Sequence, residues 1–321
     1  MDLKLSHVRT LQDVIRHGSF TGAARARHLT QPAISLHIRE LEAQVGQPLI
    51  EKIGKRALAT KAATILLQHA GRVFEELNAA KHALQRLEGV VSGPVRLGTG
   101  ATASIYLLPI VLRDLRLRFP ALELVVATGN TKEITQAVID NELDFGVVTL
   151  PVVHRQLHIK PIFSDPLVAI APPGHPLKQR APLSPTVLAQ QPLILFEPGG
   201  NIRKVIDDWF QAKRAIPRVV MELGSAEATK KLVGAGLGLS LISKMAVENE
   251  CRAGELLEIA IQPRLTRQLG TIHRRDKPMT DPFQIVLSAV ARYLLDKRGA
   301  GRRKRRRGAA KASTARDARQ P

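Results

Sequence analysis

Apolar residues at the start of the chain recur every three or four positions, the spacing of one face of an α-helix. They are Leu5, Val8, Leu11, Val14 and Ile15. Gly18 interrupts this pattern, and Ser19 is a favoured N-cap for a second helix that runs to about Arg27. A third helix is predicted from Pro32 to Gly46, because proline favours a first helical position and glycine commonly follows a helix end. Residues 1–62 are therefore expected to form a small helical domain.

A long helix is predicted over residues 61–88, which contain no proline. Its apolar positions alternate steps of four and three, the heptad spacing of a coiled-coil seam. The seam positions are Leu66, Ala70, Val73, Leu77, Ala80, Leu84 and Leu87. A helix between two domains has little else against which to bury such a stripe. We therefore expect residues 63–91 to form a linker that pairs two chains, the alternative being a helix that packs only on its own domain.

Strands and helices alternate from Ser92 onward. Strands are predicted at residues 95–99, 122–128, 145–149, 167–171, 193–196, 219–223 and 239–242. Helices are predicted at residues 102–119, 131–141, 202–212, 225–234 and 282–296. This alternation indicates an α/β fold with a parallel sheet and crossover helices. Residues 92–297 are therefore expected to form one α/β domain divided into two lobes.

The charge of the chain is strongly positive and unevenly distributed. Its 48 Lys and Arg residues against 28 Asp and Glu give a net charge of +20. Residues 298–321 carry +9 of this and residues 1–62 carry +5. Such a balance suits a polyanionic partner, most commonly nucleic acid. The 298–321 tail has almost no apolar bulk and is expected to be disordered, either contacting phosphates without sequence preference or serving no role.

Composition also indicates the cellular setting. Cys251 is the single cysteine, so no internal disulfide can form and a reducing compartment is expected. The first residues lack the apolar core of a signal peptide, and no apolar run reaches membrane-spanning length. We therefore expect a cytoplasmic protein with no membrane partner.

Two stretches that superficially suggest cofactor or metal chemistry lack the required context. Residues 234–238 are rich in glycine but follow a predicted helix instead of a strand, so they do not form a dinucleotide loop. His154 and His158 lie between Pro151 and Pro161, which disfavours a helix pairing them as ligands. No Ser/His/Asp spacing or carboxylate pair stands out. We expect no cofactor, no metal and no enzymatic activity.

Residues 19–42 have the parts of a helix-turn-helix. Ala23 and Ala24 are small enough for two helices to cross closely, and Leu29 is expected to plug the turn. Apolar anchors in the second helix are Ile34, Ile38 and Leu41. Thr30, Gln31, Ser35 and Arg39 are then left outward near its N-terminal end, where a recognition helix reads base edges.

The run Ser-Phe-Thr-x-Ala-Ala from Ser19, the run Leu-Thr-Gln-Pro-Ala-Ile-Ser from Leu29, and Leu41-Glu42 resemble the LysR-type transcriptional regulators. This resemblance implies a winged helix-turn-helix, a long linker helix and a C-terminal two-lobed α/β effector domain similar to periplasmic binding proteins. With the wing, the DNA-binding residues it implies are Thr30, Gln31, Pro32, Ser35, His37, Arg39, Lys52, Lys55 and Arg56.

Some positions depart from the family pattern. Ile50 and Lys52 stand where the wing usually has Phe and Arg, and lysine lacks the planar fork of arginine. Leu36 stands where polar base-reading residues are frequent, so a base preference does not carry over from the family.

The effector site is expected between the two lobes. Residues 97–109, 119–120, 129–131 and 142–148 resemble the family's α/β domain, and ligands of open α/β sheets bind at the carboxyl ends of strands. The candidate effector residues are Thr102, Ala103, Thr128, Asn130, Thr149, Asn201 and Ser225. Hydroxyls and free amides at a helix start favour a carboxylate, sulfate or phosphate. The alternative is that these residues only cap helices.

The sequence thus predicts a homodimer or homotetramer that binds double-stranded DNA at an inverted repeat and responds to a small, anionic metabolite, with RNA polymerase as a further partner. Three alternatives remain at this point: a non-sensing nucleoid protein, a solute-binding protein, and an enzyme fused to a DNA-binding domain. The first would bind DNA with a steep salt dependence and no site preference. The second requires a signal peptide and the third a catalytic set, and neither is present.

Overall fold

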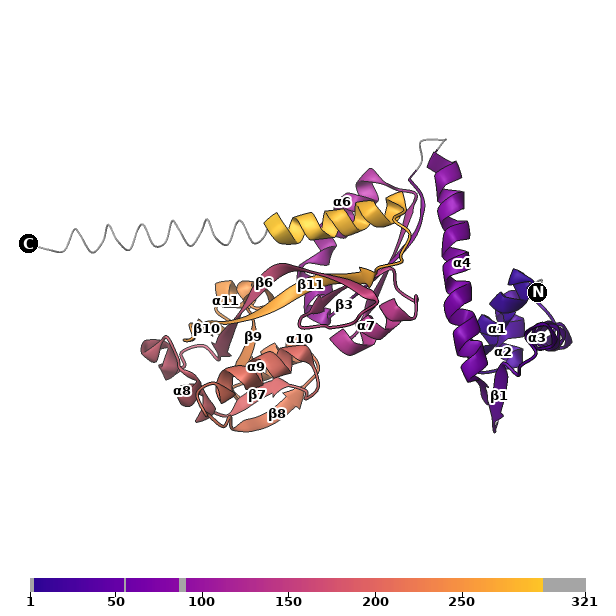
Figure 1. The fold of residues 1–321 in the computed structure, drawn as a ribbon. Coiled ribbons are helices and arrows are strands. Elements are labelled where there is room, and N and C mark those ends of the chain that lie inside the picture. The colour runs from indigo at the N-terminus through magenta and orange to yellow at the C-terminus, as the bar shows by residue number, and fades with distance from the viewer. Residues whose placement is uncertain (1–2, 55, 87–90, 297–321) are drawn as a thin grey trace, which may run out of the picture. The chain divides into compact units, whose positions relative to one another are not determined.

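The computed structural model describes residues 3–54, 56–86 and 91–296. The predicted wing residue Lys55, the predicted seam residue Leu87 and the predicted tail 298–321 lie outside these described residues. The chain divides into two compact units, Met1–Leu84 and Gln85–Pro321, shown in Figure 1. No helix within the described ranges is long and apolar enough to cross a membrane.

The first unit is a helical domain with a small β-hairpin. In chain order its elements are α1 (Leu5–His17), α2 (Phe20–Arg27), α3 (Gln31–Val45), β1 (Ile50–Ile53), β2 (Arg56–Ala59) and α4 (Lys61–Arg86). Strand β1 pairs antiparallel with β2, and we call this hairpin the wing. The three helices predicted over the first 46 residues are confirmed, each within one or two residues of its expected ends.

Local capping explains why these helices begin and end where they do. The Ser19 hydroxyl accepts a hydrogen bond from the backbone N–H of Gly22 (3.0 Å) at the start of α2. The Thr30 hydroxyl accepts one from Ala33 (3.4 Å) at the start of α3. Gly18 ends α1 in the left-handed region with φ of 63°, a conformation that glycine adopts without steric cost.

The second unit contains two lobes. Lobe I is built from β3 (Gly93–Thr99), α5 (Ala101–Tyr106), α6 (Leu108–Arg118), β4 (Leu122–Thr128), α7 (Thr131–Ile139), β5 (Phe145–Thr149) and a helix over residues 281–296. Lobe II is built from η1 (Pro176–Arg180), α8 (Pro185–Ala189), β7 (Leu193–Phe196), α9 (Asn201–Gln211), β8 (Val219–Leu223), α10 (Ala226–Gly234), β9 (Ser240–Ser243), η2 (Lys244–Ala246), α11 (Glu248–Ala253) and β10 (Leu257–Ile259).

Two long strands run from one lobe to the other, β6 (Leu157–Ala171) and β11 (Leu265–Arg274), as Figure 1 shows. The main sheet has the order β10-β6-β11-β5-β3-β4, with β9 beside β6. The prediction of a parallel sheet is therefore only partly right. Strand β3 is parallel to β4 and β5, and β7 to β8, but β11 is antiparallel to β5 and β6. Both antiparallel pairs arise because β11 runs opposite to its two neighbours, β5 and β6.

The hydrophobic core is divided where these strands cross. Ile162 and Phe163 of β6 pack in a lobe I core, whereas Leu167 packs in the lobe II core. Between them the buried Asp165 carboxylate accepts a hydrogen bond from Nε of Arg267 (2.7 Å), its partner in the β11 register. The Ser243 hydroxyl donates to the same carboxylate at 2.8 Å. Two adjacent strands, β6 and β11, and this ion pair between them therefore connect the core of lobe I to the core of lobe II.

One predicted helix is broken in the structure. Residues 102–119 form α5 and α6 instead of one continuous helix, with a break at Leu107. Pro109, which lacks a backbone N–H, occupies the first turn of α6, where that donor is not needed. The break gives α5 its own direction at the carboxyl end of β3.

Candidate DNA interface and effector cleft

Helix α3 has one buried side and one exposed side. Ile34, Ile38 and Leu41 are buried in the core of the first unit. Thr30, Gln31, Pro32 and Arg39 are exposed, and Ser35 is half-buried. The Gln31 amide donates a hydrogen bond to the Ser35 hydroxyl (2.9 Å), so these two predicted reading residues share one side of the helix. This is the arrangement that a recognition helix requires.

His37 faces α1 instead of solvent. Its ring stacks on that of His7 with centroids 4.3 Å apart and an interplanar angle of 18°, and its Nδ1 lies 3.1 Å from the Thr10 hydroxyl. Burial and the neighbouring His37 lower the pKa of His7, although Glu40 opposes this. His37 thus holds α3 against α1, and its role in reading DNA stays a prediction.

Leu29 does not plug the turn as expected, because its side chain is 40% exposed. Helix α2 ends at His28 in the left-handed conformation, with φ of 53°. The backbone N–H of Leu29 bonds to the Ala24 carbonyl (3.0 Å), and its side chain stays outside the core. The core beneath the turn is filled instead by Ala23 and Ala24.

The wing is attached to α3 by a residue that sequence reasoning assigned no role. Oε1 of Glu42 accepts hydrogen bonds from the backbone N–H groups of Leu49 (2.7 Å) and Ile50 (3.3 Å). Lys52 and Arg56 are exposed on the wing strands, and the Lys52 ammonium lies 5.2 Å from the centre of the Phe20 ring. Glu42 therefore fixes the wing, with its two exposed cations, relative to α3.

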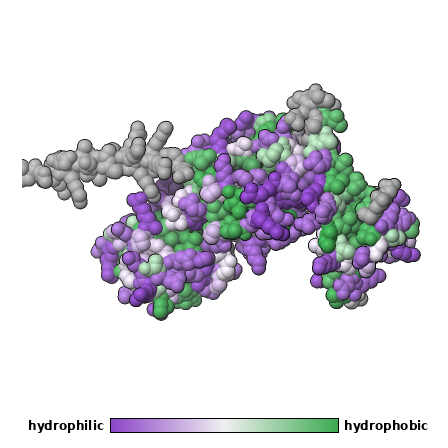
Figure 2. Space-filling model, in the orientation of Figure 1, coloured by the Kyte–Doolittle hydropathy of each residue, from purple (hydrophilic) through white to green (hydrophobic). Residues whose placement is uncertain are grey.

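Helix α4 carries an exposed apolar stripe over its second half. Val73, Leu77 and Leu84 are 45%, 50% and 66% exposed, with the exposed Ala80 between them. Hydrophobic colouring gathers along this helix in Figure 2. Leu66 differs, because it packs with Ala63 and Ala70 on the core of its own unit. The first half of α4 thus packs on its own unit, and the described residues of the predicted seam are exposed only from Val73 onward.

In lobe I, the predicted effector residues lie at the carboxyl ends of β3, β4 and β5. Thr102 and Ala103 are buried in α5, at 8% and 4% exposure, directly after β3. Strand register aligns Thr99 with Thr128 on one side and Val147 on the other, so Thr128 and Thr149 end at the same edge. The structure therefore brings these residues together, as expected for a ligand site in an open α/β sheet.

Three other effector candidates have structural roles. Asn130 forms a capping box with Glu133 at the start of α7. The Ser225 hydroxyl caps α10 by accepting from the N–H of Ala228 (3.3 Å). The Asn201 side chain donates to the carbonyls of Thr149 (2.6 Å) and Pro151 (3.0 Å), joining the start of α9 in lobe II to lobe I. A residue that caps a helix or joins the lobes can also contact a ligand only if its side chain has a further hydrogen-bond donor or acceptor available.

A second polar junction between the lobes was not found from sequence. Lys230 of α10 is 3% exposed, and its ammonium donates to the hydroxyl of Tyr106 in α5 (2.7 Å). It also lies 2.5 Å from Glu250 and 2.9 Å from Glu227. The Tyr106 hydroxyl in turn donates to Glu227. We call Tyr106, Glu227, Lys230 and Glu250 the lobe junction.

Electrostatics keep the lobe junction charged. Burial by itself lowers the pKa of Lys230, but hydrogen bonds to Glu250, Tyr106 and Glu227 outweigh it and raise that pKa above its ordinary value. The pKa of Tyr106 is raised by burial and by its bond to Glu227. Helical spacing is the signal that could have revealed this lysine, since Lys230 shares the buried side of α10 with Ala226 and Val233.

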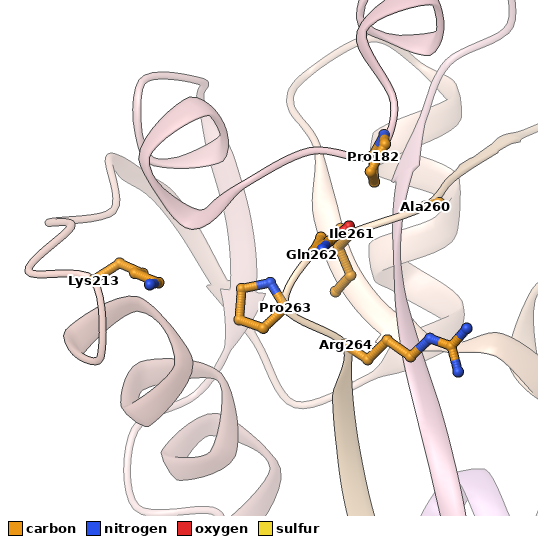
Figure 3. A pocket seen from close by; sticks show the side chains of 7 residues that line it. All are labelled: Pro182, Lys213, Ala260, Ile261, Gln262, Pro263 and Arg264. Atoms are coloured by element: carbon orange, nitrogen blue, oxygen red, sulfur yellow. The ribbon is translucent and has the colours of Figure 1, made fainter.

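Lobe II also contains an open pocket of about 770 Å³. Its lining is Pro182, Lys213 and residues 260–264, and Lys213 extends toward Pro263 (Figure 3). None of the predicted effector residues lines it. The Pro263 carbonyl accepts a hydrogen bond from the Trp209 indole (2.8 Å), which ties this loop to α9.

The histidines and the cysteine considered in the sequence have other surroundings in the described part of the chain. No group of three or more His, Cys, Asp or Glu side chains within it is placed to hold a metal ion. His158, considered above as a metal ligand, stacks on His273 with ring centroids 4.9 Å apart. Burial, with the nearby charges of Glu258 and Glu250, raises the pKa of the Cys251 thiol, which disfavours the reactive thiolate.

Two family models match the sequence. The one described as a bacterial regulatory helix-turn-helix protein of the lysR family matches residues 5–64. The one described as a LysR substrate binding domain matches residues 88–295. The chain is also 32% identical over 288 residues to the HTH-type transcriptional regulator YeiE of Escherichia coli strain K12, covering 89% of this chain and 97% of that protein.

Two solved structures extend the comparison. A full-length OxyR variant from Pseudomonas aeruginosa superposes with a TM-score of 0.74 at 22% identity, covering 92% of this chain and 95% of that one, which shows a shared fold. The Synechocystis CcmR regulatory domain, solved in complex with 2-PG, superposes with a TM-score of 0.58 at 27% identity. That match covers 62% of this chain and 96% of that domain.

Proposed function

We propose that this chain, which belongs to the LysR family of bacterial transcriptional regulators, reads promoter DNA through α3 and changes transcription when a small anionic metabolite occupies the cleft between its lobes. As a member of this family it is a DNA-binding regulator with an effector-binding domain, not an enzyme. The residues that perform each task, the charge of the effector and the assembly are the proposed parts.

The proposal that α3 reads DNA rests on the exposed polar side of this helix. Thr30, Gln31, Pro32, Ser35 and Arg39 approach base edges in the major groove, since α3 is anchored to its unit by its opposite, buried side. Lys52 and Arg56 of the wing contact the phosphate backbone, which adds affinity without sequence preference.

Replacement of Gln31 or Ser35 by Ala tests this assignment. Loss of a base contact costs about 1–3 kcal/mol, so each variant is expected to bind its promoter site at least about fivefold more weakly. Binding to unrelated DNA and the mass of the assembly should stay unchanged. The matched control is Gln12→Ala, an exposed glutamine of α1. An unaltered footprint for both variants would reject α3 as the reading helix.

The proposal for the effector site rests on the residues at the carboxyl ends of β3, β4 and β5. Thr102 is buried, and its hydroxyl bonds to no other residue that the structure describes. The hydroxyl donors of Thr102, Thr128 and Thr149 suit an anionic group, and Ala103 would contact it by packing, since its amide bonds to the Gly100 carbonyl (3.0 Å). Asn201, which bonds to the Thr149 carbonyl, and Ser225 are the residues proposed to contribute from lobe II. The CcmR regulatory domain binds 2-PG, which favours a small-molecule effector here as well.

A thermal-shift screen against inorganic phosphate, sulfate and small carboxylates tests whether an anion binds at the proposed effector site. An effector at a hundred times its Kd stabilises the protein by about 2.7 kcal/mol. Thr102→Val should remove the shift produced by the active anion, whereas Thr186→Val, an exposed threonine of α8, should retain it. An identical shift in the Thr102 variant would exclude this threonine from the site.

We further propose that two chains pair through Val73, Leu77, Ala80 and Leu84 of α4, so that two α3 helices meet the half-sites of an inverted repeat. Two such dimers associate through the α/β units. Effector binding then changes the spacing of the bound half-sites, with a coupling free energy of about 1–3 kcal/mol, and RNA polymerase responds to the altered complex.

A further inference from the structure

Leu36 projects from the middle of the exposed side of α3. Its side chain is 52% exposed, whereas Ile34, Ile38 and Leu41 on the same helix are at most 3% exposed. At about 100° per residue, Leu36 points roughly opposite to the mean direction of these three anchors. It therefore occupies the line of α3 that reaches farthest from the core.

The neighbours of Leu36 on this line are the proposed reading residues. Pro32 lies one turn before it and Arg39 nearly one turn after it, and both are exposed. Ser35, which accepts a hydrogen bond of 2.9 Å from Gln31, precedes Leu36 by one position and lies about 100° away around the helix. A groove that receives these side chains also receives Leu36. Single exposed leucines are common on protein surfaces, so exposure alone indicates nothing. Leu36 is informative because it lies between proposed reading residues.

A leucine side chain has no hydrogen-bond donor or acceptor, and it can recognise a base only through an apolar contact. In the major groove the four bases present donors and acceptors, and thymine alone adds a methyl group at C5. Resting on the proposed DNA-reading role of α3, we infer that Leu36 reads thymine in each half-site through that methyl group. The contact removes the apolar surface of the leucine and of the methyl group from water. This burial favours the bound complex.

Replacement of thymine by deoxyuridine removes the methyl group and leaves base pairing intact. The full chain is first used to select its operator from random duplexes. Each operator thymine is then replaced in turn. Burial of one methyl-sized group is worth about 0.8 kcal/mol, so wild-type Kd is expected to rise about fourfold at one or more thymines in each half-site.

Leu36→Ala supplies the decisive comparison. Alanine favours helix more than leucine does and the site is exposed, so the variant should fold, as far-UV circular dichroism checks. It is expected to bind the thymine and deoxyuridine operators equally. The matched control is Leu5→Ala, an exposed leucine of α1, which should keep the wild-type difference.

The outcomes separate this inference from the proposed function. A wild-type chain that selects an operator but tolerates deoxyuridine at every position overturns the role of Leu36 alone. So does a Leu36→Ala variant that keeps the full thymine preference. A chain that selects no operator at all overturns this inference together with sequence-specific DNA reading.

Discussion

The ammonium of Lys230 lies 2.7 Å from the phenolic oxygen of Tyr106, although 124 positions separate the two residues in the chain. Lys230 belongs to α10 of lobe II and Tyr106 to α5 of lobe I, four residues after Thr102. The lobe junction and the proposed effector site therefore share α5, and a ligand that moves this helix also strains the contact with Lys230.

Tyr106→Phe removes the hydroxyl that joins Lys230 to Glu227. Loss of a hydrogen bond to charged groups costs about 1.5–3 kcal/mol in the free energy of unfolding. Lys230→Met leaves two partly exposed carboxylates without their cation and is expected to cost about 1.5–3 kcal/mol. Urea denaturation of the full chain measures both, and the double variant should cost less than the sum because the two residues share one network.

A surface ion pair in lobe I provides the control for the lobe junction. Asp114 and Arg118 lie 3.3 Å apart with side chains 58% and 61% exposed, so Asp114→Asn should cost less than about 1 kcal/mol. Strictly additive effects of the Tyr106 and Lys230 substitutions would show that the two side chains do not act together.

Asn201→Ala removes both hydrogen bonds from α9 to the carbonyls of Thr149 and Pro151. We expect the amide hydrogens of Thr149 and Leu150 to exchange at least severalfold faster, because two neutral bonds contribute about 1–3 kcal/mol together. Hydrogen-exchange mass spectrometry measures this. Asn249→Ala, in the exposed part of α11, is the control, and equal exchange in both variants would contradict a lobe-joining role for Asn201.

The stacked pair of His7 and His37 predicts acid sensitivity of the first unit. Burial and the charge of His37 lower the pKa of His7 in the folded state below its ordinary value of 6.5. The folded state therefore binds a proton at His7 less readily than the unfolded state does. The stability that this group contributes is full above about pH 6.5 and is lost as the pH falls below it.

His7→Phe tests that sign. Phenylalanine keeps an aromatic ring beside His37 but does not titrate, so the variant should lose less stability than wild type between pH 7 and pH 5. Thermal unfolding followed by circular dichroism provides the comparison. His69→Gln, on the exposed side of α4, should behave as wild type. Parallel pH profiles for wild type and His7→Phe would contradict the prediction.

Leu77→Glu combined with Leu84→Glu places charges in the exposed stripe of α4. If this stripe is the seam between two chains, burying two unpaired carboxylates costs several kcal/mol per chain, and the assembly should dissociate. Sedimentation velocity measures the mass. Gln68→Glu adds a charge to an exposed position of α4 outside the predicted seam and should leave the mass unchanged. An unchanged mass in the double variant would place the dimer contact elsewhere.

Elements with regular local patterns could be predicted closely from sequence. Strands β4, β5, β7 and β8 have the predicted bounds, and the predicted cap Ser19 begins α2. Strand β11 was missed, because charged and polar residues such as Arg267 and Gln268 interrupt its apolar pattern. Arg267 is nevertheless buried, since Asp165 on the neighbouring strand neutralises it.

The sequence by itself determined the local units of this protein: three helices anchored by Ile34 and its neighbours, a linker helix with a heptad stripe, and strands whose ends gather Thr102, Thr128 and Thr149. These features depend on spacing within a few turns or residues, which the chain carries explicitly. Only the tertiary structure decided which distant groups meet, such as Lys230 with Tyr106, Asn201 with Thr149, and His37 with His7. Such contacts depend on the topology that brings two lobes or two helices together. A local sequence pattern does not show which residues far apart in the chain will meet.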